Sequence, residues 1–174
     1  MASLSSNAAT SDGSREGLPG PVVLVVDDEA ALATQLTAAV EVLGYRVVAV
    51  HSAQVASKLL DATPGIMVVV SDIRMPGEDG LSFAARVMAA RPGSEALAFI
   101  MITGHLGIDA ATIAQRICGA DLLQKPFGLA ELKEALARAI RRASDRREAA
   151  RATRASPPSQ TAPTEPRPGK GATH

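Results

Sequence analysis

The sequence predicts an α/β fold, in which a five-stranded parallel sheet is doubly wound by helices on both faces. Two runs, residues 22–26 and 66–70, are apolar at every position, and such runs are typical of strands covered on both faces. Strand-like runs alternate with stretches of helical periodicity five times, which indicates right-handed crossovers. Five such units in about 120 residues favour the strand order 2-1-3-4-5.

In the first half of the chain, apolar spacing and turn residues define the elements. The apolar side chains from Leu32 to Leu43 are spaced by 4, 4 and 3 residues, which predicts an amphipathic helix that Gly44 ends. Pro64-Gly65 separates the second helix from the third strand. The predicted strands here are 22–26, 45–50 and 66–70, and the predicted helices are 30–43 and 53–60.

The second half continues the alternation. Met75-Pro76-Gly77 stops the third strand, and Thr103-Gly104 finishes the fourth. The last helix carries an apolar stripe from Leu129 to Ile140 with spacings of 3, 4 and 4. The predicted strands are 97–102 and 121–124, and the predicted helices are 81–90, 109–118 and 129–140.

The 174 residues divide into one domain and two tails. Residues 1–20 are rich in Ser, Ala and Gly and are predicted to be disordered, and residues 21–142 form the domain. Residues 143–174 are basic and then Pro-rich, and we expect them to be mostly disordered, although the last helix could continue to Ala155 before Pro157-Pro158.

The charge is unevenly distributed. Residues 21–128 carry 7 basic and 11 acidic side chains, a balance of −4, whereas residues 129–174 carry 10 basic and 5 acidic ones, a balance of +5. A basic tail could steer towards an acidic partner, but most such tails are merely solvated. The single cysteine, Cys118, suits a reducing compartment. No apolar run is long enough to span a bilayer and no signal segment is present, so we expect a cytoplasmic protein without membrane insertion.

Polar residues follow four of the predicted strands at their carboxyl ends: Asp27-Asp28, Asp72, Thr103 and Lys125. In the order 2-1-3-4-5 these four strands are neighbours, so their ends converge. Crowded carboxylates favour a hard cation such as Mg²⁺, and a lysine and a hydroxyl can receive an anion beside it. This combination indicates phosphoryl transfer with Asp72, on the central strand, as the nucleophile. Each residue alone could be a helix cap, a helix-start acid or a turn residue.

These motifs closely resemble the receiver domain of two-component response regulators, over about residues 21–142. The segments that carry the resemblance are Val25-Val26-Asp27-Asp28-Glu29, Ser71-Asp72-Ile73-Arg74-Met75-Pro76-Gly77-Glu78-Asp79-Gly80-Leu81, Ile102-Thr103-Gly104 and Lys125-Pro126-Phe127.

The resemblance implies a role for each matched residue. Asp72 would accept phosphate from a histidine kinase or phosphotransfer protein, Thr103 would hydrogen-bond the phosphoryl group, and Lys125 would pair with it through a cis Lys125-Pro126 loop. Mg²⁺ would be bound directly by Asp28 and largely through water by Asp27, and Asp72 and the main-chain carbonyl of Arg74 would also belong to the metal site.

One position departs from the family pattern. Leu122 stands where the family usually has the aromatic residue that moves inward on activation, so the usual coupling between the threonine and that residue is in doubt. Two positions tune the lifetime of the phosphorylated state in the family, and here they are Arg74 and His105, although both could be ordinary rim side chains. His51 and His174 have no partner motif and receive no role.

The favoured function is a stand-alone response regulator that signals to an unknown downstream protein by binding or by passing phosphate along a relay. Such a protein is not an enzyme beyond its own phosphorylation and dephosphorylation. We expect no second folded domain after the core, and therefore no direct DNA binding. One alternative is a receiver-like interaction module that acts regardless of phosphorylation, which Leu122 favours slightly. A haloacid-dehalogenase-like phosphatase is disfavoured, because Arg74 stands where its general acid belongs.

Overall fold

The computed structural model describes residues 21–90, 97–104, 112, 116 and 119–155. Five parallel strands form one sheet in the order β2-β1-β3-β4-β5, which confirms the predicted fold class and strand order. The strands are β1 Val22–Val26, β2 Arg46–Val50, β3 Ile66–Asp72, β4 Ala98–Thr103 and β5 Asp121–Gln124, and the described helices are α1 Ala30–Val42, α2 Ala53–Ala62, α3 Gly80–Ala90 and α5 Leu129–Ala155.

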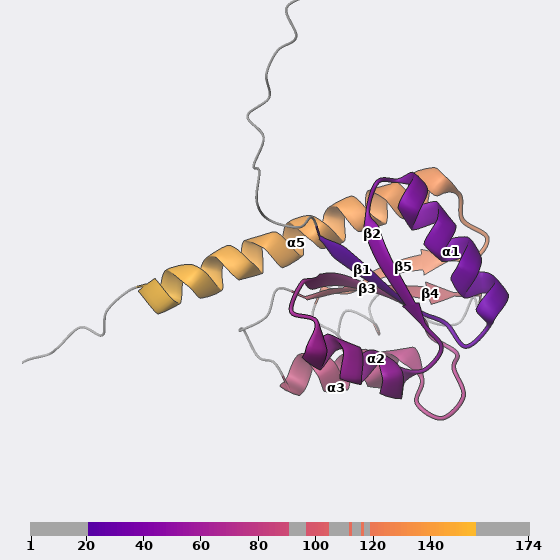
Figure 1. Ribbon diagram of the computed structural model, residues 1–174, viewed down its shortest axis with the longest axis horizontal. Helices are drawn as coiled ribbons and strands as arrows, with labels where there is room; N and C mark the ends of the chain where they lie inside the picture. The colour runs from indigo at the N-terminus through magenta and orange to yellow at the C-terminus, as the bar shows by residue number, and fades with distance from the viewer. Residues whose placement is uncertain (1–20, 91–96, 105–111, 113–115, 117–118, 156–174) are drawn as a thin grey trace, which may run out of the picture.

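Helices cover both faces of the sheet, with α1 and α5 on one face and α2 and α3 on the other (Figure 1). Alternate residues of each central strand therefore enter two different cores. Val23, Val25 and Val68 pack with α1 and α5, whereas Leu24 and Val69 pack with α2 and α3. This double burial explains why these strands show no alternation of apolar and polar residues.

The strand register sets the polar residues level with one another. Val26 pairs with Ser71 of β3, Asp72 pairs with Ile102, and Thr103 pairs with Gln124. The residues that directly follow β1 and β5 therefore lie at the same edge of the sheet as Asp72 and Thr103. All four carboxyl-end positions singled out from the sequence meet there.

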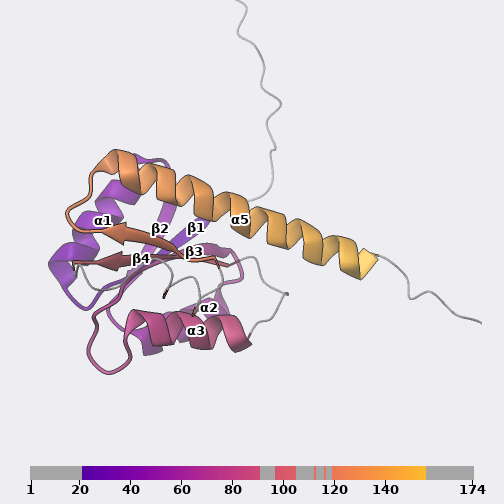
Figure 2. The same ribbon diagram turned by 180° about the vertical axis from the view of Figure 1, so that it is seen from behind.

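Helix α5 extends beyond the predicted stripe and ends at Ala155, the residue to which the sequence allowed it to continue, although the predicted division assigns residues 143–155 to a mostly disordered tail. Its final turns reach beyond the rest of the domain in both views (Figures 1 and 2). Ala143 is fully buried, Arg146 Nη1 donates to the Leu97 carbonyl (2.9 Å), and Arg147 Nη2 donates to the Pro64 carbonyl (3.0 Å). These contacts attach the helix to the domain beyond the predicted boundary at residue 142.

Some predicted elements fall on residues outside those that the structure describes. The predicted helix 109–118 is one of them, apart from residues 112 and 116. The disorder expected for residues 1–20 and 156–174 stays a prediction for the same reason. Within the described ranges, every helix is too short or too polar to cross a lipid bilayer.

Candidate functional site

The centre of the site is an ion pair between residues that are 53 positions apart. Lys125 Nζ donates to Asp72 Oδ2 at 2.8 Å, and the side chains are only 28% and 15% exposed, respectively. The other carboxylate oxygen, Asp72 Oδ1, accepts the main-chain N–H of Arg74 (3.2 Å). A cavity of about 240 Å³ opens beside this pair, and it is lined by Asp72, Arg74, Gly104 and Lys125. The ion pair therefore faces a space that a small anionic group can enter.

Thr103 joins the same edge of the sheet from β4. Its side chain is almost fully buried, and its main-chain carbonyl accepts the N–H of Lys125 at 2.7 Å. This backbone contact places the threonine directly beside the lysine. The Lys125-Pro126 peptide that follows is cis, as the family resemblance implied.

Asp27 is the most buried acid of the group, with only 1% of its surface exposed. Its Oδ1 accepts the N–H of Glu29 (2.9 Å), but its Oδ2 is buried and has no hydrogen-bond partner within the described part of the chain. Burial is the main reason why the pKa of Asp27 is raised, and the negative charges of Asp72 and Asp28 add to it. The Glu29 hydrogen bond and the positive charge of Lys125 oppose this rise.

The acids suit a divalent cation in their chemistry. No three His, Cys, Asp or Glu side chains among the described residues are grouped to hold a metal ion. Mg²⁺ does not require three, because it keeps several waters and uses one or two carboxylates plus phosphate oxygens. The unpartnered Oδ2 of Asp27, and the repulsion of Asp27 by Asp72 and Asp28, are features that such a cation would relieve. Asp28 itself is exposed to solvent and accessible to a metal ion.

Two further predicted positions differ in what the structure describes of them. Leu122 is partly buried, pairs with Met101 of β4 and packs against the core beneath α2 and α3. These contacts do not test the expected role of Leu122 at the switch position, which stays a prediction. His105 lies outside the described residues, so its role in lifetime tuning stays a prediction.

Three residues at this edge received no role from the sequence. Gly80 lies so close to β3 that a Cβ there would overlap the Asp72 carbonyl oxygen and lie 2.9 Å from Met101 Cε. Ser71 is fully buried and donates its hydroxyl to the same carbonyl (3.0 Å). His51 Nδ1 lies 3.0 Å from the Asp27 carbonyl. Two sequence features could have pointed to these residues: His51 follows a predicted strand, and Gly80 lies within a motif that matches the family.

Comparison with known proteins supports one family. Residues 23–137 match the family model described as the response regulator receiver domain. The chain is 34% identical over 123 residues to the transcriptional regulatory protein FixJ of Bradyrhizobium diazoefficiens, covering 70% of this chain and 57% of FixJ. It is also 34% identical over 120 residues to the DNA-binding transcriptional regulator NtrC of Escherichia coli, covering 68% of this chain and 24% of NtrC. The chain thus spans little more than half of one relative and a quarter of the other.

Solved structures agree with the fold. A response regulator receiver domain protein from Clostridium thermocellum is 26% identical, with a TM-score of 0.64 over 71% of this chain and 97% of its own. The signal receiver domain of an HD domain-containing protein from Pseudomonas fluorescens is 25% identical, with a TM-score of 0.68 over 82% of this chain and 98% of its own.

Proposed function

Because the chain belongs to the response regulator receiver domain family, we propose that it is a phosphoacceptor in a two-component system or phosphorelay. In this proposal a histidine kinase or a phosphotransfer protein phosphorylates Asp72. The observation that carries it is the Lys125–Asp72 ion pair, which faces a cavity and whose two charges act on the buried acid Asp27. A carboxylate that is paired with a lysine and lines a cavity is suited to accept a phosphoryl group.

The proposed reaction is a displacement at phosphorus. A carboxylate oxygen of Asp72 forms a bond to the phosphorus atom, the bond from phosphorus to the donor's imidazole nitrogen breaks, and the imidazole leaves and takes up a proton. Lys125 then neutralises charge on the phosphoryl oxygens, and the hydroxyl of Thr103 hydrogen-bonds one of them. When Mg²⁺ is bound it supplies further positive charge, and Asp27, Asp28, Asp72 and the Arg74 carbonyl would hold it.

The downstream step is proposed to be contact with another protein, either by binding or by passing the phosphoryl group on, in the cytoplasm. The DNA binding named for NtrC is not transferred to this chain, because the chain spans only 24% of that protein. A phosphorylation-independent interaction module is the second candidate, and Leu122 favours it, since a leucine lacks the aromatic ring of the usual switch residue.

Incubation with acetyl phosphate and Mg²⁺ tests the proposal. Intact-mass spectrometry should show the addition of one phosphoryl group to the wild-type protein and none to Asp72→Asn. Asp121→Asn is the matched control, because Asp121 is also a partly buried, ion-paired acid but lies at the other end of the sheet. Equal labelling of Asp72→Asn and the wild type would refute the assignment of Asp72.

A further inference from the structure

The segment that follows the phosphoacceptor is held at both of its ends. Ile73 N–H donates to the Ile102 carbonyl (3.0 Å), and Gly80 N–H donates to the Ile73 carbonyl (2.9 Å). Between these anchors lies Arg74, which lines the cavity and whose N–H contacts Asp72. The path of residues 74–79 therefore sets one wall of the space where the phosphoryl group would arrive.

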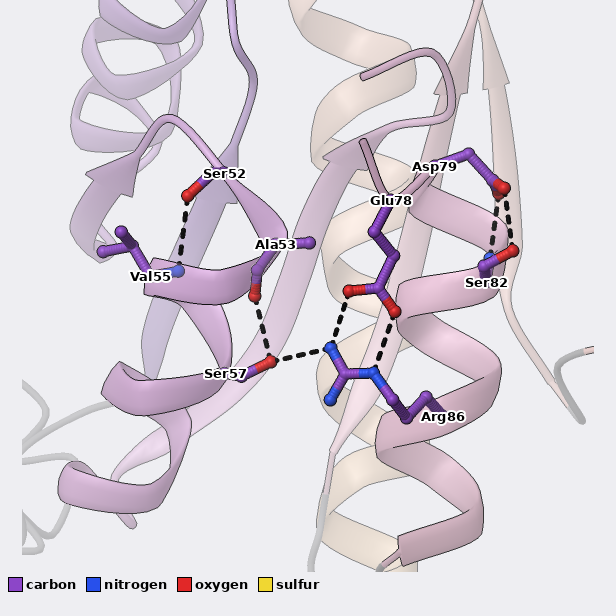
Figure 3. Close-up of polar contacts among 8 residues, drawn as sticks. All are labelled: Ser52, Ala53, Val55, Ser57, Glu78, Asp79, Ser82 and Arg86. Atoms are coloured by element: carbon purple, nitrogen blue, oxygen red, sulfur yellow. Dashed lines mark hydrogen bonds and ion pairs between the residues drawn. The ribbon is translucent and has the colours of Figure 1, made fainter. Parts of the chain in front are cut away.

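The middle of this segment turns at Gly77 and lies against α2. Gly77 has a φ of +82°, a conformation that favours glycine. A Cβ on Gly77 would be 3.9 Å from the side-chain nitrogen of Gln54, in the first turn of α2. The next residue, Glu78, directs its side chain towards α3 (Figure 3).

Arg86 of α3 forms a bidentate salt bridge with Glu78. Arg86 Nε donates to Glu78 Oε1 (2.8 Å) and Arg86 Nη2 donates to Glu78 Oε2 (2.7 Å), as Figure 3 shows. Parallel hydrogen bonds of this kind fix the relative orientation of both groups, which a single point charge does not. Glu78 is only 22% exposed, and the contact with Arg86 lowers the pKa of its carboxyl group.

The guanidinium of Arg86 is itself braced by two neighbours. Its Nη2 also donates to Ser57 Oγ on α2 (3.0 Å), while the Ser57 hydroxyl donates to the Ala53 carbonyl (2.9 Å). Its carbon Cζ lies 5.7 Å from the centre of the Phe83 ring, and Phe83 is fully buried. Arg86 therefore links the segment after Asp72 to α2 and α3, the two helices described on this face of the sheet.

We propose that Arg86 is a positioning residue for phosphoryl transfer: through Glu78 and Ser57 it holds residues 74–79, and with them the Arg74 wall of the cavity, in the geometry that Asp72 needs to accept a phosphoryl group. This inference rests on the proposed function. An exposed ion pair is ordinarily weak, but the bidentate geometry and the two braces order a loop that carries part of the site.

The test compares Arg86→Gln with Arg138→Gln, using phosphoramidate as donor with saturating Mg²⁺. The two arginines are matched, since their side chains are 50% and 46% exposed and both pair with a carboxylate, but Arg138 pairs with Asp121 on a different surface. Arg86→Gln should lower the maximal rate of phosphorylation about five- to tenfold, with a smaller change in the half-saturating donor concentration. Arg138→Gln should match the wild type.

Two more variants separate positioning from folding. Arg86→Lys keeps the charge but cannot form both parallel bonds, so it should recover less than half of the lost rate. Ser57→Ala removes one brace and leaves Glu78 paired, so it should slow phosphorylation by about twofold. Both variants should unfold in urea at the same denaturant concentration as the wild type, within about 0.5 M.

The outcomes distinguish this inference from the proposed function. If wild-type protein takes up no phosphoryl group, the proposed function fails. If the wild type is phosphorylated and Arg86→Gln, Arg86→Lys and Ser57→Ala keep its rate, the positioning role is overturned, even if Arg86→Gln is less stable. If Arg86→Gln does not fold, the rates of Arg86→Lys and Ser57→Ala decide the matter in the same way.

Discussion

The two ends of the sheet treat their polar groups differently. At the carboxyl end, Asp27 is buried with one oxygen unpartnered among the described residues, and the Asp72–Lys125 pair faces a cavity. At the amino end, arginines of α5 meet their partners within the chain: Arg142 pairs with Asp121 at the start of β5, and Arg146 and Arg147 donate to main-chain carbonyls. Even there, Arg142 Nε is buried without a partner in the described part of the chain, although Nη2 is paired.

This difference between the two ends indicates that the carboxyl end is arranged for binding and the amino end for stability. A buried polar atom without a partner costs about 1–3 kcal/mol, which a fold optimised only for stability would avoid. At the carboxyl end the unpartnered atom is a carboxylate oxygen where the proposed ligands would satisfy it, whereas at the amino end it belongs to a guanidinium that Asp121 already pairs through Nη2.

The largest loss of stability is expected from a substitution at Gly80, which packs against β3 next to Asp72. Gly80→Ala should lower the free energy of unfolding by roughly 3 kcal/mol and impair phosphorylation, because the added methyl group overlaps the Asp72 carbonyl oxygen. Urea unfolding measures the first effect. Gly65→Ala, at the amino end, is the control, since its methyl group would only touch Val22 at 3.9 Å. Equal stability of the two variants would contradict the close approach.

Breaking the amino end should affect stability alone. Asp121→Asn removes the charge that pairs with Arg138 and Arg142, and it should lower the free energy of unfolding by about 2 kcal/mol. Its rate of phosphorylation should equal that of the wild type. Glu134→Gln, which affects only a long contact of 3.9 Å to Arg138, should change stability by less than about 0.5 kcal/mol. A slowed phosphorylation in Asp121→Asn would show that the two ends are coupled.

Neutralising the buried acid Asp27 should raise the free energy of unfolding, whereas the two preceding substitutions lower it. Asp27→Asn removes a charge that burial and the repulsion by Asp72 and Asp28 disfavour, so at neutral pH without Mg²⁺ it should raise the free energy of unfolding by about 1 kcal/mol. Its phosphorylation should become slower, because the site loses an acidic group. Thermal and urea unfolding of both proteins measure the change. A less stable Asp27→Asn would mean that the charge of Asp27 is not a destabilising feature.

The smallest expected effect is on stability at acidic pH, and it comes from Asp79 at the start of α3. Burial raises the pKa of Asp79, but it is outweighed by hydrogen bonds from the N–H (2.9 Å) and hydroxyl (2.7 Å) of Ser82 together with the Leu81 N–H and the charge of Arg116, so the pKa is lowered. A carboxyl group with a lowered pKa stabilises the fold above its unfolded pKa, and this contribution is lost as the pH falls through the folded value. Stability should therefore decline below about pH 4.

Asp79→Asn provides the comparison for this effect. Asparagine also caps helices but does not titrate, so this part of the acid dependence should disappear while stability at pH 7 falls by less than about 1 kcal/mol. Urea unfolding of both proteins between pH 3 and pH 7 measures it. Parallel pH profiles would show that Asp79 contributes nothing to acid sensitivity.

The sequence alone determined the architecture and which four strand-end residues meet at one edge of the sheet. Uninterrupted apolar runs such as 66–70 are typical of strands covered on both faces, and their alternation with helical stripes leaves a parallel sheet. Because the carboxyl ends of parallel strands lie at one edge, the positions of Asp27, Asp72, Thr103 and Lys125 after their strands are enough to place them together. These inferences depend on periodicity and chain direction, which are local properties.

Only the tertiary structure decided the contacts between elements. The pairing of Lys125 with Asp72, the approach of Gly80 to β3, and the link from Arg86 to Glu78 and Ser57 have no signature in spacing along the chain. The same holds for α5, where residues beyond 142 offered only alanine as apolar material, yet Arg146 and Arg147 reach the carbonyls of Leu97 and Pro64. Such contacts depend on the distance and angle at which helices pack on the sheet, and packing is a property of the whole fold.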